Sequence, residues 1–115
     1  MAKCGVETKN DPPTLAQMSF AEFQQSLAAT AGPPAGLSPA LQALWHDARG
    51  DWDRAHACAQ EDGSRAGAWV HAYLHRKEGD DGNAGYWYAR AVRPFFQGDA
   101  EAEREHIARA LLAER

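Results

Sequence analysis

The sequence has little cysteine, no excess of basic residues and no long apolar segment, and each absence excludes a class of protein. Its cysteines, Cys4 and Cys58, form no C-x-x-C motif, and two cysteines are too few for a disulfide framework. We therefore expect two free thiols in a reducing compartment. Residues 1–11 contain no apolar core of the kind that a secretory signal needs, so the cytoplasm is the expected location.

Acidic side chains outnumber basic ones by 16 to 12, which gives a formal net charge of −4. A general nucleic-acid-binding protein needs a basic face that displaces counterions from phosphates. Residues 23–45 carry no charged side chain, but their glutamines, glycines and adjacent prolines exclude a transmembrane helix. We therefore expect neither a nucleic-acid partner nor a membrane partner.

What the sequence does contain is helical periodicity. Apolar residues recur at spacings of three and four along most of the chain, which favours amphipathic helices. The expected parts are a disordered leader at 1–13, a single helical domain at 14–115, hairpins at about 38–60 and 64–93, and capping helices at about 14–30 and 99–113. The predicted fold class is therefore all-α, with about five or six helices.

Local signals mark where these helices begin. Ser19 and Glu22 have the spacing of a capping box, which indicates a helix start at Ser19 within the segment 14–30. Ser38 followed by Pro39 is a typical helix start, because proline at the first helical position loses no hydrogen bond.

The middle of the chain aligns with itself at a shift of 29 residues, so that position 50, for example, is equivalent to position 79. The equivalent pairs are Ala43/Ala72, His46/His75, Gly50/Gly79, Asp51/Asp80 and Ala55/Ala84. The Gly-Asp pair is the informative one, because glycine ends one helix and aspartate caps the next. A repeated helical hairpin is typical of helical-repeat proteins.

Residues 80–91, with aspartate, alanine, Trp-Tyr and alanine in that order, resemble the second helix of Sel-like repeats, a branch of the tetratricopeptide superfamily. Residues 44–55 resemble the tetratricopeptide helix turn, so the resemblance covers 38–93. It implies antiparallel hairpins stacked as a short right-handed superhelix, with the first helices lining a partner-facing side. The whole chain is also similar to short uncharacterised bacterial proteins, a similarity that implies no activity.

The leading prediction for function is a protein-interaction module without catalysis, cofactor or bound metal, whose protein partner is not identified. The side implied to face the partner carries Gln42, His46, Arg49, His71, His75 and Glu78. Tyr86 and Arg90 lie one turn apart and form a second candidate contact surface. A homodimer is a further option, because a stack of two hairpins leaves apolar ends.

Two alternatives remain open. His71, His75 and Glu78 share one helix face, and two histidines one turn apart can bind a metal together with a carboxylate. A small metal-binding or hydrolytic protein would use this cluster, although Ala72 stands where the zinc hydrolase motif needs glutamate. The other alternative is a binder of a small apolar ligand between aromatic helices.

The remaining aromatic and histidine residues fit a core. His56 follows Trp52 by one turn on an apolar face, so we interpret it as a core or boundary histidine with one hydrogen-bond partner. Periodicity places Trp87 and Tyr88 inward and Tyr86 outward. The sequence has no nucleophile elbow and no phosphate-binding glycine loop, so the residues predict no catalytic group.

Overall fold

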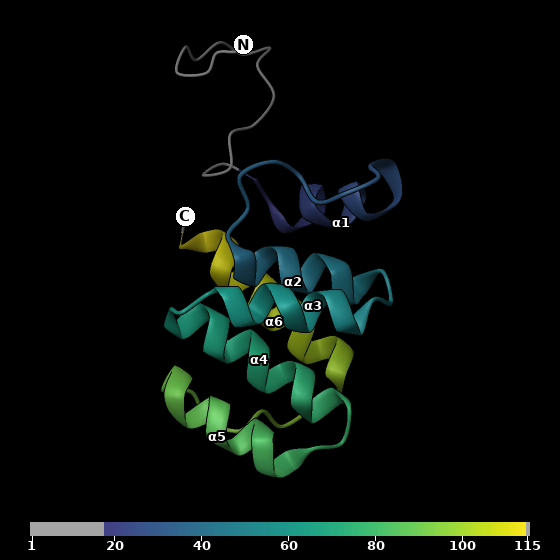
Figure 1. Cartoon of the computed structure of the whole chain (residues 1–115). Coiled ribbons are helices and arrows are strands. Elements are labelled where there is room, and N and C mark those ends of the chain that lie inside the picture. Colours follow the sequence, from purple (N-terminus) through teal and green to yellow (C-terminus); the bar gives the residue numbers. More distant parts are fainter. Residues whose placement is uncertain (1–17, 115) are drawn as a thin grey trace.

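The computed structural model describes residues 18–114, where 70% of the residues are helical and no strand occurs (Figure 1). The helices are α1 (Phe20–Ala29), α2 (Pro39–Ala48), α3 (Trp52–Glu61), α4 (Arg65–Lys77), α5 (Asp81–Ala91) and α6 (Ala100–Ala113). The all-α prediction is therefore confirmed. The predicted leader, positions 14–17 of the expected first helix and residue 115 lie outside the described residues.

Each helix begins at a side chain that caps it. The N-cap residues, whose oxygens accept a hydrogen bond from a backbone N–H in the first turn, are Ser19, Ser38, Asp51, Ser64, Asp80 and Asp99. Ser19 and Glu22 form the predicted capping box, so α1 begins at Phe20. Gly50 and Gly79 have φ angles of +83° and +92°, which glycine adopts readily, and they follow α2 and α4 as predicted.

The end of α5 differs from the expectation. The second hairpin was predicted to reach about residue 93, just before Pro94, which cannot continue a helix, but α5 ends earlier, at Ala91. The next residue, Val92, adopts the left-handed conformation with φ 59°, and its backbone N–H donates to carbonyls of the last turn. This conformation is uncommon for a β-branched residue. The left-handed residue, rather than the proline, therefore turns the chain away from the helix.

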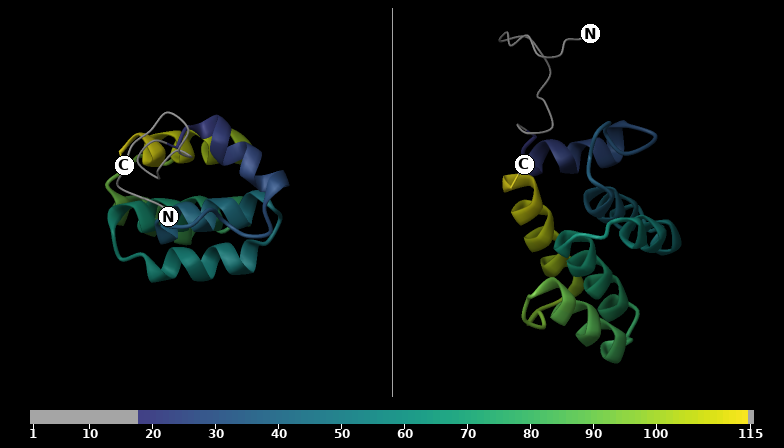
Figure 2. Two further views of the ribbon diagram at one scale, coloured as in Figure 1. Left: turned by 90° about the horizontal axis from the view of Figure 1, so that it is seen from above. Right: turned by 60° about the vertical axis from the view of Figure 1, so that its left-hand side comes forward.

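The helices form two hairpins and two further elements around them. α2 packs against α3, α4 packs against α5, and α3 lies against α4, so that the hairpins stack. α2 and α4 form the middle of the molecule, with α3 and α6 on opposite sides of it (Figure 2). Each hairpin, α2–α3 and α4–α5, has a short turn between its helices.

The position of α6 differs from the expected cap at the end of the stack. This helix runs across α2 and α4 and also contacts α1. Its buried side chains include Ile107 and Leu111, which pack into the core, and Glu103, whose exposed fraction is 0%. The sequence showed an apolar face on this helix, but it did not show which surface that face covers.

The core centres on large side chains of α2 and α4, among them Trp45 and Tyr73. The Trp45 indole N–H donates to Ser26 Oγ of α1 at 2.9 Å. The Arg49 guanidinium lies over the Trp45 ring and donates to the Thr30 carbonyl at 3.0 Å. These bonds attach α1 to the hairpin that follows it.

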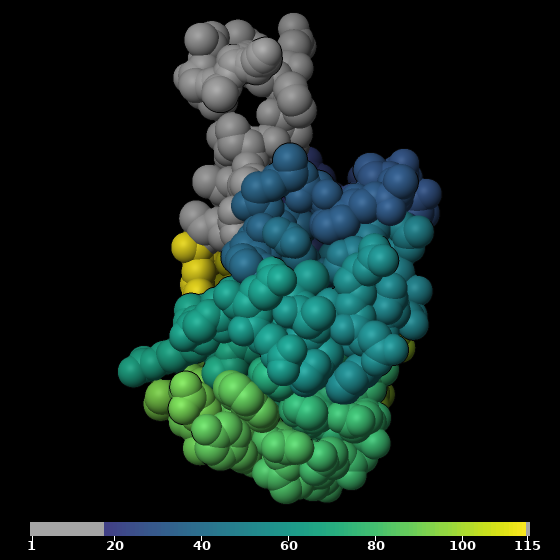
Figure 3. All heavy atoms as spheres, viewed as in Figure 1, coloured from purple at the N-terminus to yellow at the C-terminus, as the bar shows by residue number. Residues whose placement is uncertain are grey.

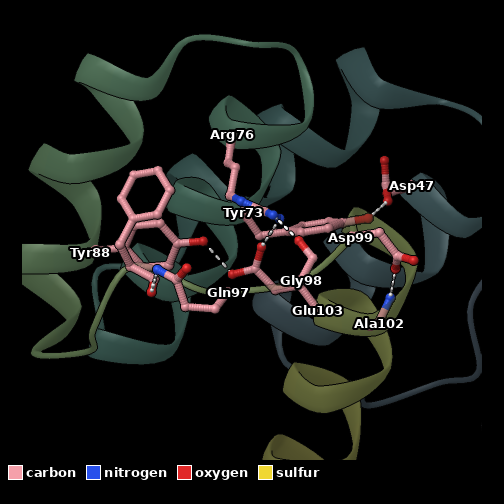
Figure 4. Close-up of polar contacts among 10 residues, drawn as sticks. Asp47, Tyr73, Arg76, Tyr88, Gln97, Gly98, Asp99, Ala102 and Glu103 are labelled. Atoms are coloured by element: carbon pink, nitrogen blue, oxygen red, sulfur yellow. Dashed lines mark hydrogen bonds and ion pairs between the residues drawn. The ribbon is translucent and has the colours of Figure 1, made fainter.

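A polar network also lies inside the molecule (Figure 4). Asp47 accepts hydrogen bonds from the Tyr73 hydroxyl and from Lys77 Nζ, the latter at 2.9 Å. Glu103 accepts from the Tyr88 hydroxyl and from Arg76 at 3.0 Å, and burial raises the pKa of its carboxyl group. The two carboxylates connect α4 to α2 and α6, and Tyr88 brings in α5.

Two further predictions concern transmembrane helices and the cysteine thiols. Among the described residues no helix combines the length and apolarity needed to cross a bilayer. Cys58 is a free, half-buried thiol on α3, and burial raises its pKa. Cys4 lies outside the described residues.

Candidate metal centre

Three imidazoles meet between the two hairpins. His71 and His75 lie one turn apart on α4, and His56 reaches them from α3. The Nε2 atoms of His71 and His56 are 2.9 Å apart. One ligand nitrogen of each ring lies within 4.8 Å of the other two. We call these three residues the histidine cluster.

His71 is the most buried member of the histidine cluster, with an exposed fraction of 4%. A residue on a partner-facing side would be expected to be exposed, but His71 is buried. The reason is Trp87 of α5, whose ring stacks on the His71 imidazole at 3.9 Å between centroids. Trp87 is half-buried and faces inward as predicted, so the α4–α5 hairpin covers the histidine.

A second tryptophan supports the cluster from the other hairpin. Trp52 stacks on the His56 imidazole at 4.9 Å, with 11° between the ring planes. Its indole N–H donates to the Leu74 carbonyl at 3.0 Å, which fixes the ring against α4. His56 is therefore a boundary histidine, as predicted, and its hydrogen-bond partner is His71. Each of these imidazoles is held in its orientation by a neighbouring indole.

Glu78 joins the site through His75. Its Oε1 atom lies 2.8 Å from His75 Nδ1, which leaves Nε2 of that ring without a carboxylate partner. A carboxylate bonded to the far nitrogen of a histidine is the usual outer partner of a metal ligand. His75, Glu78 and Asp80 are also close enough together to bind one metal ion. However, Asp80 already accepts hydrogen bonds from Asn83 as the N-cap of α5.

The surroundings of His71 and His56 favour the neutral form of both rings. Burial, together with smaller contributions from charge repulsion by the neighbouring His56 and His75, lowers the pKa of His71 to about 4. Burial, together with His75, also lowers the pKa of His56, against the opposing effect of Glu78 and Asp53. Neutral imidazole is the form that binds a metal ion.

The pKa of His71 predicts a pH dependence of stability for the metal-free protein. Because an unfolded histidine has a pKa of 6.5, the unfolded chain takes up its proton first as the pH falls. Stability is therefore complete above pH 6.5, and His71 alone reduces it by about 2 kcal/mol between pH 6.5 and 5. Urea unfolding at pH 7.5 and at pH 5.0 measures this change in the free energy of unfolding. Between these two pH values the His71→Gln variant should lose about 2 kcal/mol less stability than the wild type.

The other predicted contact residues lie on α2, just after it, and on α5, and each has its own surroundings. Gln42 donates to the Leu37 carbonyl at 2.7 Å, and Arg49 binds the end of α1. His46 is half-buried, and burial lowers its pKa. Tyr86 is 55% exposed, with Arg90 over its ring at 5.8 Å, so the predicted outward pair forms on α5.

The sequence pattern did not connect His56 with His71 and His75. Spacing of three or four relates residues of a single helix, and His56 belongs to a different helix from the other two. The useful signal was Trp52 one turn before it, which indicated that the His56 ring is packed but not which residues it packs against.

Figure 3 shows the surface where α3, α4 and α5 lie side by side. No protein-family model, curated protein or solved structure matches the chain.

Proposed function

We propose that this protein binds a transition-metal ion of the zinc class through His56, His71 and His75. The observation that supports the proposal is the convergence of three imidazole nitrogens, from two hairpins, within 4.8 Å. Two of the rings are stacked on tryptophans and one is bonded to a carboxylate. Such an arrangement is preorganised, since few side-chain rotations are left to lose on binding.

The donor set fits this class of ion. Imidazole nitrogen suits zinc, copper and nickel, whereas magnesium and calcium prefer oxygen ligands. Zinc–nitrogen bonds of about 2.0–2.1 Å place tetrahedral ligands about 3.3 Å apart. The 2.9 Å between His71 and His56 is slightly shorter, so these rings need to separate by only a few tenths of an ångström.

Three histidines leave a fourth coordination position for water or a ligand, which distinguishes catalytic zinc sites from closed structural ones. A zinc-class ion held there would supply Lewis-acid chemistry. The residues of the chain would bind the ion, orient the rings and connect the hairpins, since His56 belongs to α3 and its partners to α4.

A calorimetric titration with Zn²⁺ near pH 7.5 tests the proposal. We expect His71→Ala or His56→Ala to weaken zinc binding by about 100-fold, because loss of an outer partner alone costs 10–100-fold. His46→Ala is the matched control, since His46 is a half-buried histidine outside the cluster. Its affinity should stay within about twofold of the wild type. Unchanged affinity in His71→Ala would refute the site.

A gentler variant protects this test against misfolding of a buried position. Glu78 is exposed, and Glu78→Gln removes the charge beside His75 Nδ1 without disturbing the core. Zinc affinity should fall by about tenfold with the circular dichroism spectrum unchanged. Co²⁺ absorption bands provide a second readout, because their intensity reports a tetrahedral site directly.

A second candidate is a protein-interaction module of the tetratricopeptide or Sel-like kind, located in the cytoplasm. Two stacked hairpins with a Gly-Asp turn in each support this reading, as does the exposed Tyr86 beside Arg90. Affinity capture from the host lysate, with a Tyr86→Ser/Arg90→Glu double variant beside the wild type, tests it. A partner that the variant loses would support the module, whereas identical captures would count against this surface.

A further inference from the structure

A cleft of about 380 Å³ adjoins the histidine cluster. Its lining comes from the end of α3, the α3–α4 turn, the first half of α4, and Trp87 and Arg90 of α5. His71 and Trp87 both line it, so His71 belongs to the cleft as well as to the histidine cluster. A ligand in the cleft would therefore lie next to a metal ion held by the cluster.

The charge of the cleft favours an anion. Arg65 and Arg90 line it, and within residues 18–114 neither forms an ion pair. The acidic residue in the lining is Asp62, whose two oxygens are already occupied. One accepts from the Ser64 backbone N–H at 2.9 Å, and the other from the Ala40 backbone N–H at 3.1 Å. The two guanidinium groups therefore outnumber the one carboxylate in the lining, although Arg90 also donates to the Tyr86 hydroxyl at 3.4 Å.

The cleft also offers an aromatic surface. The Arg90 guanidinium lies over the Trp87 ring at 5.5 Å from its centroid, and the same indole stacks on His71. Ala59 and Ala68 line the same cleft and add small apolar contacts. A guanidinium beside an aromatic ring suits a ligand that combines an oxyanion with a flat apolar body.

We infer that this cleft binds a small aromatic oxyanion, a carboxylate or a phosphate-like group, next to the metal ion. The inference rests on the proposed metal site, because the charge of the ion adds to that of Arg65 and Arg90. Metal and anion should then strengthen each other's binding by the same factor, as thermodynamic linkage requires.

Three probes of similar shape test the inference by calorimetry with zinc-loaded protein. Benzoate and phenylphosphonate carry the two oxyanion types, and benzamide is their neutral control. We expect one or both anions to bind at least tenfold more tightly than benzamide. Zinc-free protein should bind the same anions more weakly. Equal binding of benzamide and both anions would overturn the inference.

Substitutions then locate the binding. Arg90→Gln and Arg65→Gln should each weaken anion binding by about tenfold and leave zinc affinity within about twofold. Arg90→Lys keeps the charge and should recover part of the loss. Arg54→Gln, on an exposed arginine outside the cleft, should change nothing. Anion affinities that are unchanged in both Arg90→Gln and Arg65→Gln would count against the cleft as the binding site.

The outcomes separate this inference from the proposed function. Zinc binding without anion binding would leave the metal site standing and refute the anion cleft. If the wild type fails to bind zinc, the proposed function fails. Anion titrations of the metal-free protein then decide whether the cleft binds an anion. Anion binding that Arg90→Gln abolishes would then support the cleft by itself, and no anion binding would overturn it.

Discussion

Replacing Glu103 with alanine is expected to lower the free energy of unfolding by about 3–5 kcal/mol. The carboxylate is fully buried on α6 and accepts hydrogen bonds from Arg76 and from the Tyr88 hydroxyl. Its removal leaves a guanidinium without its partner, a buried hydroxyl without an acceptor, and a cavity. Chemical denaturation should show the loss as an earlier midpoint, and the melting temperature should fall by more than about 12 °C.

Glu105→Ala is the matched control, because it removes the same side chain from the same helix. Glu105 is exposed and pairs with Arg109 one turn away, at 2.7 Å. Such surface pairs contribute about 0.3–0.5 kcal/mol. The loss of stability in Glu103→Gln should lie between those of Glu103→Ala and Glu105→Ala. Burial already raises the pKa of this carboxyl group, and the amide keeps its shape. A cost below 1 kcal/mol for Glu103→Ala would show that the network does not stabilise the fold.

Gly67→Ala is expected to destabilise the protein by about 3 kcal/mol, although alanine favours helix more than glycine does. Gly67 lies in the first turn of α4, close to the end of the preceding turn. A methyl group there would lie 2.0 Å from the Asp62 carbonyl oxygen and 2.7 Å from its Cβ. Because backbone atoms cannot rotate away, the cost should reach the upper end of the 1–3 kcal/mol typical of overpacking.

Gly85→Ala provides a control of opposite sign. Gly85 lies inside α5, and a methyl group added to it would meet no atom within 4 Å. With space available, the helix propensity of alanine should stabilise the protein by about 0.5–1 kcal/mol. Unfolding curves of the two variants, recorded side by side, test both predictions. A stabilised Gly67→Ala would mean that the α3–α4 turn can move aside.

The parts of the fold that depend on neighbouring residues could be predicted from the sequence. Ser19 with Glu22, and Ser38 with Pro39, act within one helical turn, and both marked helix starts that the structure confirms. Gly50 and Gly79 likewise end their helices through their own backbone conformation. Val92 was missed, because nothing in its side chain favours a left-handed residue.

The candidate site depends on contacts between helices, and there the sequence was less informative. The pair His71 and His75 follows from helical spacing, but the approach of His56 depends on how α3 packs on α4. Glu103 shows the same limit, because an acidic residue on a largely charged helix gives no sign of burial. Its arginine partner is 27 positions away, beyond any local pattern.

The path of α6 has a consequence for how the molecule unfolds. In an open helical array each repeat contacts only its neighbours, so terminal repeats can fray while central ones remain folded. Here α6 contacts α1, α2 and α4. Neither hairpin can open without breaking contacts far away along the chain. The hairpins should therefore lose their structure together in one cooperative transition, at a rate set by non-local contacts and not by stepwise loss from one end.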